Sequence, residues 1–205
     1  MEHRYRHGDI AGVPHRGMLG RLMKRVFTPH TNMVHWVLIC DYIESEEDYV
    51  ILESIGKGVA VGRLSWYKDY RVFRPTAKST CIRLRPVAES TCIRRDSCRE
   101  YLGIWACQEL TKYGRAKYDW GFVLSLPFAC VCCWLQQLLT TGRTWPIKAA
   151  DLPYSLDDRL CCTEAAVLAW RLVGVYLVPV STMPIPSALL EAVEKGILKE
   201  VKEEL

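Results

Sequence analysis

The chain has 205 residues, of which 50% are hydrophobic and 24% are charged, and this composition is typical of one folded domain with an apolar core. We expect a single domain over residues 1–205, strand-rich over 1–90 and helix-rich over 91–205. The net charge of +4 is too small to indicate a nucleic-acid partner, and no nucleic-acid-binding motif occurs.

The first residues, MEHRYRHGD, contain no apolar signal-peptide core, which predicts a cytoplasmic location. In that compartment the ten cysteines are expected to stay reduced and to behave as small buried hydrophobes. Their spacing, C-x-C-C at 130–133 and an adjacent pair at 161–162, suits a tetrahedral metal site poorly. We therefore expect no metal and no cofactor.

The first half of the chain is rich in β-branched and aromatic residues divided by turn signals, which is typical of strands. The acidic run 44–48 and the glycines of 55–58 are the clearest turns, and they predict a meander of antiparallel strands. The strands are expected over 33–43, 49–53, 59–64, 70–75 and 81–86.

The second half has apolar residues at helical spacing, with stop signals at Gly114 and Gly174. Helices are expected over about 98–113, 128–141 and 158–173, and from Ser187 through Val201. Strands followed by helices predict an α+β domain, with an antiparallel sheet or small barrel packed against helices.

No charged residue occurs from Trp120 to Gly142, and residues 122–139 are long enough to span a bilayer. Pro127 and several polar residues interrupt this segment, so a buried strand leading into a buried helix explains it equally well. Membrane contact through 122–139 therefore stays open as an alternative.

Cys162 is the candidate nucleophile, because it lies near the expected start of a helix, where the macrodipole favours a thiolate. His35 lies within the strongest predicted strand, and Glu53 ends the neighbouring strand, so the carboxylate can orient the imidazole. Each residue also has an ordinary structural explanation, as a core cysteine, an interior histidine and a solvated glutamate. Spacing alone does not decide between these interpretations.

The segments Cys162–Val167 and Gly174–Pro179 resemble the catalytic helix of NlpC-type cysteine peptidases and the step that follows it. Tyr118–Gly121 is similar to the Tyr-x-Trp-Gly stretch that precedes the cysteine in that superfamily. In the ordinary order of this superfamily the histidine follows the cysteine. No histidine follows His35 in this chain, so the ordinary order is excluded.

The permuted branch of the superfamily, which includes YiiX- and YebB-like proteins, has the histidine strand first. Its motifs resemble five short segments that occur here in the same order and extend over nearly the whole chain. These segments are Gly8-Asp9-Ile10, Thr31–Val37, Leu52-Glu53-Ser54 with Gly58-Val59, Tyr118-Asp119 and Cys162-Thr163-Glu164.

The resemblance implies a circularly permuted papain-like fold and a cysteine hydrolase of the amidase or peptidase (thiol protease) type. Cys162 would form an acyl-enzyme with His35 as base, and Glu53 would orient the imidazole. Tyr118 and Asp119 would line the substrate side of the site. Cys161 stands where the family usually has an apolar or aromatic residue, so a register shift that makes Cys161 the nucleophile is the alternative.

The expected substrate is a peptide-, amide- or lipid-like compound, and the acyl group passes either to water or to another acceptor. Two other functions remain open, a non-catalytic binding module of the same fold and a membrane-associated acyltransferase-like protein. The sequence does not specify an oligomeric state.

Overall fold

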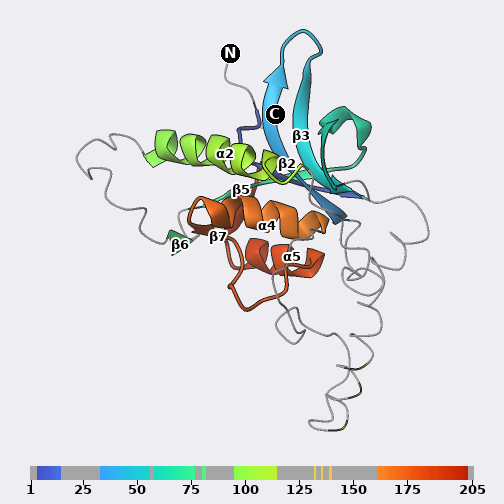
Figure 1. Cartoon of the computed structure of the whole chain (residues 1–205), viewed down its shortest axis with the longest axis vertical. Coiled ribbons are helices and arrows are strands. Elements are labelled where there is room, and N and C mark those ends of the chain that lie inside the picture. Colours follow the sequence, from blue (N-terminus) through green and yellow to red (C-terminus); the bar gives the residue numbers. More distant parts are fainter. Residues whose placement is uncertain are drawn as a thin grey trace.

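The computed structural model describes residues 4–14, 33–55, 58–76, 80–81, 95–114, 132, 135, 139 and 161–202. In this part of the chain an open, six-stranded antiparallel sheet packs against three helices. The helices lie beside one another on one side of the sheet, and the hairpin of β2 and β3 extends beyond them (Figure 1). The domain is therefore α+β.

The strands of the sheet have the order β4-β3-β2-β1-β5-β8, which makes β2 and β1 the central pair. A separate two-stranded sheet joins β6 to β7, and a short 3₁₀ helix, η1, follows β4. The bounds are β1 Ile10–Pro14, β2 Met33–Ile43, β3 Asp48–Ile55, β4 Gly58–Arg63, η1 Leu64–Trp66, β5 Arg71–Pro75, β6 Thr80–Cys81, β7 Val175–Tyr176 and β8 Leu198–Glu200.

The predicted meander holds only for β2, β3 and β4, which pair in chain order. Its continuation into β5 is wrong, because β5 pairs with β1 on the other side of β2. Strand β1 was not predicted, since five residues that include a glycine and end at Pro14 give little strand signal. The barrel alternative is also wrong, because β4 and β8 are the edges of an open sheet in the described residues.

The three helices are α2 Arg95–Thr111, α4 Cys162–Leu172 and α5 Pro186–Glu194. The predicted C-terminal helix through Val201 is too long. Gly196 adopts a φ of 70°, a backbone conformation that stops a helix, and residues 198–200 then pair with β5. The apolar residues that recur at helical spacing here therefore extend over two elements, helix α5 and the edge strand β8.

The predicted helix over 128–141 falls mostly outside the described residues; the structure describes only residues 132, 135 and 139 of this range, and these three are helical. The same holds for the apolar segment 122–139. Among the helices that the structure describes, none combines the length and the apolar character needed to cross a membrane.

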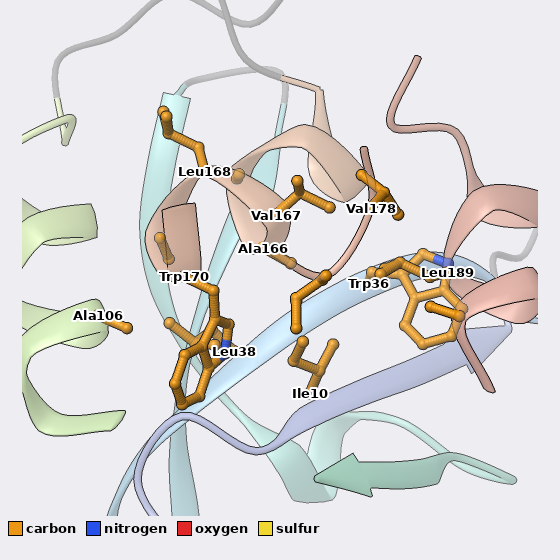
Figure 2. Close-up of a cluster of buried hydrophobic side chains, with 14 of the residues drawn as sticks. Ile10, Trp36, Leu38, Ala106, Ala166, Val167, Leu168, Trp170, Val178 and Leu189 are labelled. Atoms are coloured by element: carbon orange, nitrogen blue, oxygen red, sulfur yellow. The ribbon is translucent and has the colours of Figure 1, made fainter. Parts of the chain in front are cut away.

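From Met33 to Ile39, strand β2 is buried on both faces of the sheet. Trp36 and Leu38 join the larger core with the helices, whereas Val37 and Ile39 join a second cluster on the opposite face. Figure 2 shows Trp36 beside Leu189 and Val178 in the larger core. Because well-packed side chains hold β2 from both sides, it is a rigid scaffold for any group that it carries.

The Gly-Asp-Ile segment anchors β1 between the helices and β5. Gly8 has a φ of 82°, and a Cβ there would lie 2.6 Å from the Gly103 Cα of α2. The Trp170 indole N–H donates to the Gly8 carbonyl at 2.9 Å. Asp9, which is 1% exposed, accepts hydrogen bonds from the Arg74 guanidinium at 2.7 and 2.9 Å. This motif therefore has a structural explanation.

Candidate active site

The N-terminus of α4 meets β2 beyond the point where β2 pairs with β3. The pairing of these strands runs from Leu38 to Ile43, whereas the preceding part of β2 pairs with β1. The backbone N–H of Trp36 is directed at Cys162, the first residue of α4, and hydrogen-bonds to its sulfur. Because the pairing of β2 with β3 ends at Leu38, the N–H of Trp36 is available as a donor for the Cys162 thiol.

Cys161 has a different role, as the N-cap of α4. Its backbone N–H donates to the Glu164 carboxylate at 3.3 Å, and its sulfur accepts from backbone N–H groups of the first turn, which forms a capping box. Burial raises the pKa of the Cys161 thiol well above its usual range, and the charges of Cys162 and Glu164 raise it further. The two adjacent thiols are therefore chemically distinct.

Glu53 and His35 form a buried pair. The Nε2 atom of His35 lies 2.8 Å from Oε2 of Glu53, and the two residues are 7% and 5% exposed. Because Nε2 is engaged with the carboxylate, Nδ1 is the ring nitrogen left for the hydrogen bond to the Cys162 thiol. The imidazole therefore lies between a carboxylate and a thiol.

The charges in this site favour a thiolate and an imidazolium. Burial raises the pKa of the Cys162 thiol, but the His35 charge and hydrogen bonds from His35, Trp36 N–H and Thr163 outweigh it, so the pKa falls below its usual value. Burial lowers the pKa of His35, whereas Cys162 and then Glu53 raise it, to about 10. The arrangement can support an ion pair at neutral pH.

Tyr67 and Thr163 complete the surroundings. The Tyr67 hydroxyl donates to the same Oε2 atom of Glu53 at 2.5 Å, and the Thr163 Oγ1 atom lies 3.9 Å from the Cys162 sulfur. Burial raises the pKa of Glu53, but the hydrogen bonds from His35 and Tyr67 lower it below its usual value. Sequence reasoning missed both residues. Thr163 belongs to the Cys-Thr pair, but no spacing signal identifies Tyr67.

Of the five predicted site residues, the structure brings Cys162, His35 and Glu53 together. Tyr118 and Asp119 lie outside the described residues. Among the His, Cys, Asp and Glu side chains that the structure describes, no group of three or more is arranged to hold a metal ion.

Comparison with known proteins adds a structural likeness only. No family model matches the chain, and no curated protein matches it significantly. The similar solved structures include the metalloprotein yiiX from Escherichia coli O157:H7, described as DUF1105, with 14% identity over 98% of each chain and a TM-score of 0.49. A likeness at this level transfers neither a fold family nor an activity.

Proposed function

We propose that this chain is a cysteine hydrolase that forms an acyl-enzyme on Cys162. The observation that carries the proposal is the buried chain of contacts from the Cys162 thiol to the His35 imidazole and on to the Glu53 carboxylate. A nucleophile beside a base that a third group orients is the usual arrangement for acyl transfer.

The order of the elements supports a circularly permuted papain-like fold as part of this proposal. A helix that begins at the nucleophilic cysteine and packs against an antiparallel sheet is what a papain-like enzyme requires. Here β2, which carries His35, precedes the cysteine helix α4 in the chain, and α4 contacts both β2 and β3. This order is the one that a papain-like enzyme with its histidine strand first would have.

In the first half of the reaction, the Cys162 thiolate attacks the carbonyl carbon of an amide or ester. The His35 imidazolium gives its Nδ1 proton to the leaving amine or alkoxide, which departs as the C–N or C–O bond breaks. The backbone N–H of Cys162, the first of α4, would stabilise the oxyanion together with the helix dipole. The products are a thioester on Cys162 and a neutral imidazole.

In the second half, water attacks the thioester and gives one proton to His35 as it does so. The carbon–sulfur bond breaks, the carboxylic acid leaves, and the thiolate–imidazolium pair is restored. Glu53 takes no proton in this scheme; its Oε2 accepts the Nε2–H of His35 and so keeps Nδ1 turned towards the sulfur.

The substrate class is a peptide-, amide- or lipid-like acyl compound, and Tyr118 and Asp119 remain the proposed substrate-side residues. A small activated ester such as p-nitrophenyl acetate tests the chemistry without knowledge of the natural substrate. We expect intact-protein and peptide mass spectrometry to find one acetyl group on Cys162 at early times and its loss to water later.

Two variants control this experiment. Cys162→Ala is expected to abolish acetylation, whereas Cys161→Ala is expected to preserve it, because Cys161 caps the helix. Acetylation of Cys161, or acetylation of no thiol above the background of ordinary cysteines, would contradict the proposal and favour a binding module. Passage of the acetyl group to an added amine in preference to water would identify a transferase.

A further inference from the structure

We propose that Tyr67 is a positioning residue, which holds the Glu53 carboxylate as a double acceptor directed at His35. This inference rests on the function proposed above. It adds a fourth side chain to the site, and the resemblance of the sequence to a known family did not indicate it.

A single carboxylate oxygen of Glu53 receives two donors. Oε2 of Glu53 lies 2.8 Å from His35 Nε2 and 2.5 Å from Tyr67 Oη. An oxygen that accepts from both groups carries no proton itself. The hydrogen bond from the Tyr67 hydroxyl thus stabilises the ionised form of Glu53. It also holds the carboxylate in the orientation in which Oε2 accepts from His35 Nε2.

Tyr67 follows the η1 turn and so comes from a different element than the strands that carry the other two residues. Its backbone N–H donates to the Leu64 carbonyl at 3.0 Å and so closes the η1 turn. Leu64 is 1% exposed, and the Tyr67 ring packs against the same cluster as Leu64. The hydroxyl is therefore delivered to Glu53 from an element anchored in the core.

The Glu53 carboxylate also fits closely against β4 on its remaining side. A Cβ placed on Gly62 of β4 would lie 2.9 Å from Oε1 of Glu53 and 3.3 Å from the Trp66 ring. The absence of a side chain at Gly62 therefore leaves the space that Oε1 occupies. Glu53 is confined by Tyr67 and His35 at one oxygen and by the β4 backbone near the other.

The charges around this hydroxyl give the direction of its effect. Glu53 of β3, His35 of β2 and Cys162 of α4 are the titratable groups that act on the Tyr67–Glu53 contact. Burial and then Glu53 raise the pKa of Tyr67, which therefore remains a donor. Without this donor Glu53 takes up a proton at higher pH, and a neutral Glu53 no longer stabilises the imidazolium. The Cys162 thiolate is then lost at higher pH.

The test is the pH profile of Cys162 alkylation by iodoacetamide, measured on the full chain with site-resolved mass spectrometry. For Tyr67→Phe we expect the acid limb to move up by about half a pH unit, which lowers the rate on that limb about threefold. Tyr70→Phe is the matched control, because the Tyr70 ring lies against Tyr5 and not against the site. This control should leave the limb in place.

A second pair of variants shows whether Tyr67 acts through Glu53. In a Glu53→Gln background, Tyr67→Phe should produce no further shift, because the side chain at 53 no longer titrates. Gly62→Ala, whose methyl group displaces the same carboxylate, should move the limb in the same direction as Tyr67→Phe. This variant also covers the case in which Tyr67→Phe fails to fold.

Two results would overturn this inference without affecting the proposed function. One is an acid limb that is unchanged in both Tyr67→Phe and Gly62→Ala. The other is a shift by Tyr67→Phe that persists in the Glu53→Gln background. In either case wild-type Cys162 would still react faster than an ordinary thiol and depend on His35. A wild-type Cys162 that is no more reactive than Cys40, with no change in His35→Ala, would instead overturn the proposed function together with the inference.

Discussion

Strand β2 contacts α2, α4 and α5, and its junctions with α4 and α2 each contain a cysteine of the helix. At the junction with α4, Cys162 contacts His35 and the Trp36 N–H. At the junction with α2, Cys107 lies against Cys40. Both helices pack into the same core, and yet the pKa of the Cys162 thiol lies below its usual value whereas that of Cys40 lies above it.

The difference lies in the polarity of the groups that face each sulfur. Cys107 donates to the Ile39 carbonyl at 3.4 Å, and Cys40 points at the Leu38 carbonyl at 3.8 Å, so both sulfurs act as donors there. The contact with Cys107, followed by burial, raises the pKa of Cys40 well above its usual range. At the other junction the sulfur faces an N–H and an imidazolium. Burial alone therefore does not determine the reactivity of a thiol in this molecule.

The largest expected effect comes from removing the cation. His35→Ala turns the α4 junction into a buried thiol without a positive partner, like the α2 junction. We expect the iodoacetamide labelling rate of Cys162 at neutral pH to fall by about tenfold or more, because one unit of thiol pKa is about tenfold in thiolate. Site-resolved mass spectrometry measures this rate, and circular dichroism checks the fold. Labelling at the wild-type rate would show that His35 does not activate the thiol.

A smaller effect is expected at the α2 junction, where a substitution can lower the pKa of a thiol instead of raising it. Cys107→Ala removes the group that most raises the pKa of Cys40, so Cys40 should be labelled about threefold faster at mildly alkaline pH. Cys162 serves as the internal control, because its pKa is governed by His35 and Trp36 at the other junction, and its rate should not change. If the labelling rates of Cys40 and Cys162 rise together, the substitution has loosened the core as a whole, and this result would contradict the explanation of the Cys40 pKa by its contact with Cys107.

The smallest effect is expected at the residue next to Cys162. Cys161→Ala removes a sulfur that caps α4, and loss of an N-cap typically costs about 1 kcal/mol in the free energy of unfolding. Urea denaturation measures this loss, and the labelling rate of Cys162 should stay within about twofold of wild type. A collapse of Cys162 labelling in this variant would mean that the cap, and not His35, governs the reactivity.

Local signals predicted the elements that carry the site. The β-branched run 33–43 is strand β2, the turn chemistry after it yields β3 and β4, and the start of α4 falls at the predicted thiol. These assignments hold because burial of apolar residues at a single period determines them. Apolar periodicity gave a wrong prediction after Glu194. There the chain turns at Gly196, and the part beyond it forms strand β8 and does not continue the helix.

Other parts of the site depend on contacts between distant segments, which a single sequence does not encode in any short pattern. Tyr67 reaches Glu53 because the η1 turn returns the chain to β3, and this turn has no motif of its own. The N–H of Trp36 becomes a donor because β3 stops pairing with β2 at Leu38, a consequence of register. The insertion of β1 beside β2 is likewise a long-range pairing that local propensity could not indicate.

The most direct test of the account is the relative labelling of Cys162 and Cys40 in the wild-type chain as the pH is lowered from alkaline to acid. Cys40 is the more exposed of the two, since Cys162 is only 9% exposed, so access alone favours Cys40. We predict that Cys162 keeps reacting below neutral pH, where the pKa of Cys40 leaves it fully protonated. A common pH dependence for both thiols, with Cys40 the faster at every pH, would contradict the account.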